Sequence, residues 1–229
     1  MKKISIAIGS VLLALSGTAQ AALITSSPGG TSLVDFSQFG GDFIFTAGPV
    51  QVGDLVGEDI VWSSTSTNSV IGNGGYGLGD NGSWDAGRNG YVGLNNTFST
   101  GDYIRFDFND GPVNVVGGFV NYCILAEASQ CDPAQDFMID VLGLGDVVLE
   151  SYNISELAPI VTAGGVNEGA FRGIARESAD IMAFRLFNAV NVLDDLEFGR
   201  DGGVAVPEPA TLALLGLGLF GMGMRRRTG

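Results

Sequence analysis

The stretch that decides the fold is residues 102–123, DYIRFDFNDGPVNVVGGFVNYC. Its first seven residues alternate with a period of two, which places the side chains of Tyr103 and Asp107 on one face and apolar side chains on the other. The Asn-Asp-Gly-Pro sequence at 109–112 is a turn signal, and residues 113–123 form a second apolar run. We therefore predict that two antiparallel strands form a hairpin here.

The same pattern extends along the chain. A second hairpin is predicted over 136–154, with the turn Gly-Leu-Gly-Asp at 143–146. Residues 68–96 are rich in Gly and Asn and are expected to form long loops around one short strand. About ten short strands separated by turns fit an all-β fold, an antiparallel β-sandwich of jelly-roll type. The remaining predicted strands cover 42–47, 59–64, 91–98, 171–176, 181–187 and 192–198.

The charge of the chain excludes several function classes. The formal net charge of the 229 residues is −14, and five of the 11 basic residues lie at the two ends of the chain. Binding to nucleic-acid phosphates needs a basic face, so nucleic acid is not expected as a partner. The sequence has no His, and no Lys follows Lys3, which removes the commonest general base and Schiff-base chemistry. We expect a non-catalytic protein that binds no metal or cofactor.

Two alternatives to that expectation rest on acidic side chains. Carboxylate and amide oxygens near two turns are ligands of the kind that Ca²⁺ takes, but no EF-hand pattern is present and such residues also bond their own backbone in turns. A carboxylate-based glycan hydrolase would need two acids in one cleft, and the sequence singles out no pair. The residues considered for calcium are Asp80, Asn81, Asp85, Asn89, Asp107, Asn109 and Asp110.

The N-terminus has the three parts of a secretory signal peptide. Lys2 and Lys3 form a basic start, residues 4–15 are apolar, and Ala19-Gln20-Ala21 fits the pockets of signal peptidase. Cleavage is predicted before Ala22. Residues 1–21 are therefore expected to be removed by signal peptidase during export, and 22–204 to form the ectodomain.

The C-terminus, residues 205–229, has a different order of elements. Val206, Pro207, Glu208 and Pro209 break regular structure, 15 uncharged residues follow at 210–224, and Arg225, Arg226 and Arg227 come next. As a helix the uncharged run is about 22 Å long, which spans the roughly 30 Å hydrocarbon core only marginally. The arginines would stop transfer and stay in the cytoplasm. An ordinary membrane anchor is the alternative interpretation.

This tail resembles the PEP-CTERM sorting signal of Gram-negative bacteria, which is also labelled the ice-binding protein C-terminal domain. In that family, exosortase, a membrane-embedded cysteine transpeptidase, recognises the Pro-Glu-Pro segment and detaches the helix. The resemblance implies that the chain is exported, is transiently anchored in the inner membrane by its C-terminal helix, and then reaches the cell surface or the extracellular space. It also implies an association with exopolysaccharide and biofilm.

Aromatic residues in the body leave a carbohydrate-binding, lectin-like module as an alternative function, with extracellular polysaccharide as the partner. Trp84 lies in the Gly-rich stretch among small and polar residues, so it is expected to be exposed and to stack on a sugar ring. Trp62 lies in the predicted strand 59–64 and is expected in the core.

The two cysteines generate the first testable prediction. Export to an oxidising compartment makes a disulfide between Cys123 and Cys131 the expected state, closing a short ring that contributes about 2.5 kcal/mol. Mass mapping of peptides from the unreduced exported protein should give one cross-linked pair that reduction separates. Two thiols open to alkylation without reduction would contradict the prediction.

Overall fold

The computed structural model describes most of the predicted ectodomain, and strands dominate it. Its helical pieces are single turns, namely α1 (Ile154–Leu157) and three short 3-10 turns, so the all-β prediction is confirmed. None of the helices that the model describes is long and apolar enough to cross a membrane. Residues 1–20 of the predicted signal peptide and the predicted C-terminal helix lie outside the described residues, which are 21–41, 43–84, 90–95, 101–124, 136–162 and 164–200.

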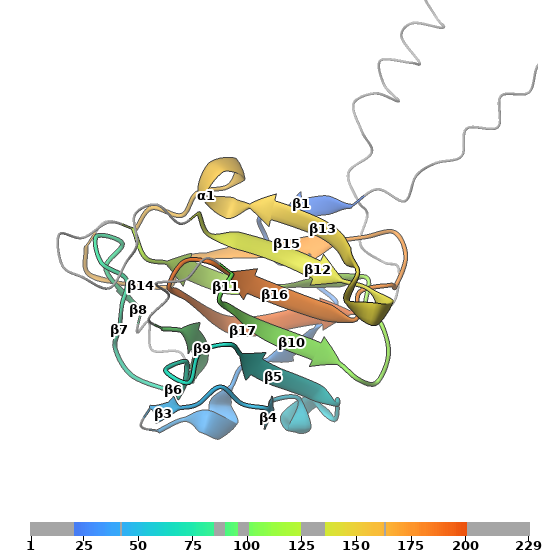
Figure 1. The fold of residues 1–229 in the computed structure, drawn as a ribbon, viewed down its shortest axis with the longest axis horizontal. Helices are drawn as coiled ribbons and strands as arrows, with labels where there is room; N and C mark the ends of the chain where they lie inside the picture. Colours follow the sequence, from blue (N-terminus) through green and yellow to red (C-terminus); the bar gives the residue numbers. More distant parts are fainter. Residues whose placement is uncertain are drawn as a thin grey trace, which may run out of the picture.

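Two antiparallel sheets make up the body (Figure 1). The larger has the order β1 (Ala22–Ile24), β15 (Ala170–Ala175), β11 (Val115–Tyr122), β17 (Asn191–Gly199), β9 (Tyr91–Leu94), β6 (Val70–Gly72) and β3 (Ile44–Phe45), with β2 (Ser32–Val34) also paired with β17. The smaller has the order β13 (Val148–Asn153), β12 (Met138–Leu142), β16 (Ala183–Phe187), β10 (Tyr103–Phe108), β5 (Ile60–Ser64) and β4 (Val50–Gln51). A small third sheet joins β14 (Val166–Asn167), β8 (Ser83–Trp84) and β7 (Tyr76–Gly77).

The main core lies between the two large sheets. Alternation along β10 buries every second residue, as the period of two predicts, and the Phe108 ring lies 5.5 Å from that of Phe198 on β17. Phe106 contacts Phe36 at 6.2 Å, and Trp62 is fully buried, as predicted. The two sheets therefore face each other across a shared apolar layer.

The first predicted hairpin is wrong, although both of its strands exist. β10 pairs with β5 and β16, whereas β11 pairs with β15 and β17, so the two strands belong to different sheets. The turn between them crosses from one sheet to the other, and Val113 N–H donates to the Ile181 carbonyl at 2.9 Å on the way. Period-two alternation identifies the buried face of a strand but not its neighbour. The second predicted hairpin, β12 with β13, is confirmed.

The Gly- and Asn-rich stretch packs more closely than predicted. It contributes β6, β7 and β8 besides β9, and its apolar side chains make up much of a second cluster of buried residues. Trp84 is fully buried in this cluster, so the prediction that it is exposed is wrong. Trp84 can be buried because Gly169 lies against its indole. A Cβ at position 169 would come within 2.9 Å of Trp84 Cζ3. The small neighbours allow close approach of the backbone.

A buried amide network fixes this stretch to β11. Asn81 is fully buried, and its side-chain amide donates to Asn121 Oδ1 at 2.7 Å and to the carbonyls of Tyr122 and Ile160 at 2.9 Å. Its Oδ1 accepts from the Thr162 N–H at 2.7 Å. Asn81 therefore joins three segments that are far apart in the sequence.

We predict that Asn81→Ala destabilises the fold by about 3 kcal/mol, because several buried donors and acceptors lose their partner at once. Chemical denaturation monitored by circular dichroism measures the loss. Asn68→Ala is the matched control, since Asn68 is exposed in a nearby turn and its loss should stay within about 0.5 kcal/mol. Equal stability of the two variants would show that the network contributes nothing.

Candidate functional site

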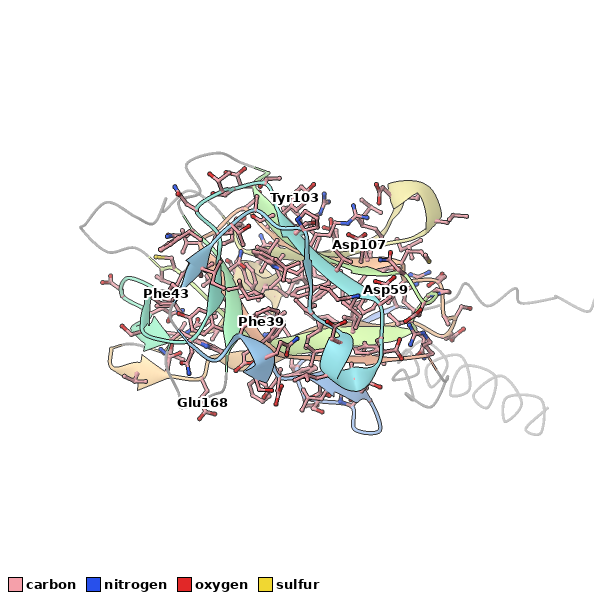
Figure 2. All side chains as sticks on the ribbon, turned by 90° about the horizontal axis from the view of Figure 1, so that it is seen from below. Phe39, Phe43, Asp59, Tyr103, Asp107 and Glu168 are labelled. Atoms are coloured by element: carbon pink, nitrogen blue, oxygen red, sulfur yellow. The ribbon has the colours of Figure 1, made fainter. Side chains whose placement is uncertain are left out.

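An aromatic pocket lies beside the edge strand β3. Its volume is about 160 Å³, and it is lined by Phe43, Phe45, Val70, Gly75, Tyr76, Gly77 and Asn95. Phe45 is 60% exposed although it is a large apolar residue, and Phe43, labelled in Figure 2, leads into the same strand. Among the described strands β3 pairs with β6 alone, so it forms an edge of the larger sheet.

Two tyrosine hydroxyls hold the floor of the pocket in place. Tyr76 Oη donates to the Leu94 carbonyl and Tyr91 Oη donates to the Gly74 carbonyl, both at 2.8 Å. The Tyr91 ring contacts Phe43 at 6.0 Å and Tyr76 at 5.8 Å, edge to face. Burial raises the pKa of Tyr76 well above its ordinary value, and Tyr91 adds to the rise, so Tyr76 stays neutral. The floor is therefore rigid and uncharged.

A glycine allows the Tyr76 ring to take this position. A Cβ at Gly93 on β9 would come within 3.1 Å of the Tyr76 ring. The site thus combines one exposed ring, buried and half-buried rings behind it, the Asn95 amide and the backbone of two glycines. Such a surface suits a ligand with apolar C–H faces and hydroxyl groups.

The outer face of the smaller sheet carries a second polar cluster. Arg105 on β10 and Arg185 on β16 lie directly opposite each other, and like charges in that position repel. Carboxylates neutralise both: Arg105 bonds Asp107 and Asp146, and Arg185 bonds Asp140. Figure 2 shows Tyr103 and Asp107 along β10.

Arg185 covers the aromatic rings of this face. Its guanidinium carbon lies 5.2 Å from the centre of the Tyr103 ring and 5.0 Å from that of Phe187. These rings already have a cationic partner, whereas Phe45 is largely open to solvent. The pocket at β3 is therefore the better candidate for binding a ligand.

Asp140 is a carboxylate with a raised pKa, which is a common property of catalytic acids. Burial raises the pKa of its carboxyl, and the hydrogen bonds and charge of Arg185 oppose that rise. Both carboxylate oxygens accept hydrogen bonds from Arg185, at 3.0 and 2.5 Å, and the side chain is only 2% exposed. Asp140 thus has the surroundings of a structural ion pair.

The residues considered for calcium are used in other ways where the structure describes them. Asn109 and Gln51 donate to Asp59, and Asp110 accepts from the Asp59 backbone N–H. No group of three or more acidic or Cys side chains suited to a metal occurs within the described ranges. Asp85 and Asn89 lie outside the described residues.

Cys123 is buried in the second apolar cluster, and no cysteine among the described residues is free. Cys131 lies outside the described residues, so its pairing with Cys123 stays a prediction.

The predicted sorting residues, Pro207, Glu208, Pro209 and the terminal arginines, also lie outside the described residues. Residues 205–227 match the PEP-CTERM protein-sorting motif, which confirms the resemblance of the tail. This motif marks an exported protein that is processed by exosortase, a membrane protein. Comparison with curated proteins gave no match.

The sequence analysis missed the pocket residues Phe43, Phe45 and Asn95. Phe45 lies within a predicted strand, at 42–47, but nothing in that pattern indicates that the strand is at an edge. Asn95 follows β9, and only the pairing of β9 with β6 brings it near β3.

We predict that Arg185→Met destabilises the fold by about 3–5 kcal/mol at pH 7, because it leaves the buried Asp140 carboxylate without its cation. Without Arg185, the folded-state pKa of Asp140 rises further above its unfolded value of about 3.9. The folded state then holds that proton more tightly than the unfolded chain. The loss should therefore be small near pH 4 and grow as pH rises through the folded-state pKa.

Urea denaturation at pH 4 and pH 7 measures this difference. Arg105→Met is the matched control, because its partners Asp107 and Asp146 are 30% and 67% exposed and water replaces the arginine. Its loss should be about 1 kcal/mol or less. Equal losses for the two variants, or a loss for Arg185→Met that does not change with pH, would contradict the prediction.

Proposed function

We propose that this chain is an exported, non-catalytic protein of the bacterial cell surface or extracellular matrix, sorted by an exosortase and associated with exopolysaccharide. The match of residues 205–227 to the PEP-CTERM motif carries the proposal. The signal-peptide features of residues 1–21 support it, because the tail must be exported before a membrane-face enzyme can reach it.

The proposal includes a jelly-roll fold for the ectodomain, in which eight strands fill two sheets through two Greek keys. β9, β17, β11 and β15 are neighbours in the larger sheet, and β10, β16, β12 and β13 are neighbours in the smaller. In chain order these strands alternate between the sheets, except that β12 and β13 stay together. That order supports the jelly-roll topology.

The non-catalytic part of the proposal is supported by the surroundings of the acidic side chains. Asp140, a described carboxylate with a raised pKa, has both oxygens bonded to Arg185. Among the described residues, the pocket beside β3 is lined by aromatic, aliphatic, glycine and amide groups and by no acid. A pocket of this composition binds a ligand more readily than it transfers a proton.

Carbohydrate binding is a second candidate function, and the exposed Phe45 ring favours it. A sugar ring stacked on Phe45 would bring its hydroxyl groups near Asn95 and the glycine backbone. The body is strongly acidic, so neutral glycans are expected over anionic ones.

Replacing Pro207 and Pro209 together with Ala should leave a larger, membrane-retained form of the protein, because the extended segment that the processing enzyme reads is lost. Immunoblots of membrane and culture fractions compare it with the parent. Pro49→Ala is the control, because Pro49 is far from the tail in the sequence. This variant should be processed normally if it folds. Normal release of the double variant would contradict the sorting proposal.

Phe45→Ala should weaken binding of the purified protein to neutral polysaccharides by about tenfold, which corresponds to 1.4 kcal/mol. A glycan array measures it, with and without Ca²⁺. Leu157→Ala is the control, because Leu157 is 59% exposed and lies on α1, away from the pocket. Unchanged binding in Phe45→Ala would remove the pocket from consideration as the glycan site.

A further inference from the structure

The start of the first strand and the end of the last strand lie in one row of the larger sheet. Ala22 on β1 pairs with Ala175 on β15, Ala175 pairs with Val115 on β11, and Val115 pairs with Gly199 on β17. Neighbouring strands are spaced by about 4.8 Å, so Ala22 and Gly199 are only about 14 Å apart. Until signal peptidase cleaves before Ala22, both predicted membrane-engaging segments are therefore attached at the same end of the body; afterwards the tail alone is attached there.

The two connections to those segments are short. Residues 16–21 separate the apolar run of the signal peptide from Ala22 and span at most about 20 Å when extended. Residues 200–209 separate Gly199 from the uncharged tail run and span at most about 35 Å. The tail connection starts from the Gly199 end of β17, so this is the end of the body from which the chain reaches the membrane.

The smaller sheet contributes to the same end, which we call the proximal end. Val113 pairs with Ile181 between the sheets, and the Phe108 N–H donates to the Met182 carbonyl beside it. Leu142 pairs with Ala183 there, so the 3-10 turn Leu144–Asp146 lies at this end, on the right in Figure 1.

Several apolar side chains at the proximal end are open to solvent. Leu144 is 85% exposed and Val147 is 60% exposed, both next to the turn after β12. Leu55 is 63% exposed in the 3-10 turn Asp54–Val56, which leads into the proximal end of β5. These side chains lie at the end of the body from which the chain leaves toward its tail.

The opposite end, which we call the distal end, carries the third sheet, on the left in Figure 1, and α1, which follows the end of β13 and is drawn at the top. The candidate pocket extends toward this end, because Asn95 follows Leu94, which pairs with Asn191 at the distal end of β17. Val161 and Val166 are exposed there, at 72% and 65%.

We propose that the proximal end rests on the lipid surface while the tail helix is inserted, and that the distal end with the pocket points away from the membrane. The proposal rests on the membrane insertion of the tail. Leu55, Leu144 and Val147 contact the acyl and headgroup boundary, which removes their apolar surface from water. The partner of these apolar side chains is a zwitterionic lipid bilayer, because the acidic body is repelled by anionic lipids.

The experiment uses the full chain reconstituted in phosphatidylcholine vesicles that contain a headgroup nitroxide lipid. A bimane label is attached to Leu144→Cys and, as the matched distal control, to Val161→Cys, without reduction. Bimane quenching should be at least twofold stronger at position 144 than at position 161. Equal quenching, or stronger quenching at position 161, overturns the proposal.

Vesicle flotation separates this proposal from the one on which it rests. A chain that fails to float with the vesicles contradicts membrane insertion of the tail, and with it the orientation. A chain that floats but is quenched equally at both positions contradicts the orientation alone. Circular dichroism checks that each variant is folded, and the pair Leu55→Cys and Val166→Cys decides by the same twofold criterion if either of the first pair is not.

Discussion

Phe106 and Phe108 on one sheet pack against Phe36 and Phe198 across the interior, and this aromatic layer is the contact on which both sheets depend. The main cluster of buried apolar side chains takes its members from both sheets. The chain crosses repeatedly between the sheets because each crossing supplies one more strand to the same layer. The Gly-rich stretch then covers the outer face of the larger sheet and closes a second, smaller cluster around Trp84.

The positions of the strands were predictable because alternation is a local property. β10, β5 and β17 fall where the period of two places them, and the β12–β13 hairpin follows from a short turn that leaves no room for a crossing. The partner of β10 was not predictable, since a turn of a few more residues permits either a hairpin or a crossing to the facing sheet. Period alone carries no information on that choice.

The candidate site was hidden from the sequence for a related reason. Phe45 is exposed because β3 ends the sheet, and its place at the edge depends on the pairing of β6 with β9. Trp84 shows the opposite error, since it was predicted to be exposed and is buried. Gly169, at a positive φ of 60°, brings the backbone against the indole. Asn81 has the composition of a turn residue, yet it is buried at the meeting point of three segments.

The central place of β17 has a consequence for the order of events during secretion. β17 is the last described strand, and it lies between β11 and β9 in the middle of the larger sheet, while β1 pairs with β15 about 150 residues later. A chain threaded from its N-terminus cannot complete this sheet until residues 191–199 have emerged. Loop-closure entropy must be overcome before these distant strands are joined, so folding is slow. The body therefore stays unfolded during translocation. It folds only after residues 191–199 have emerged, just before the tail.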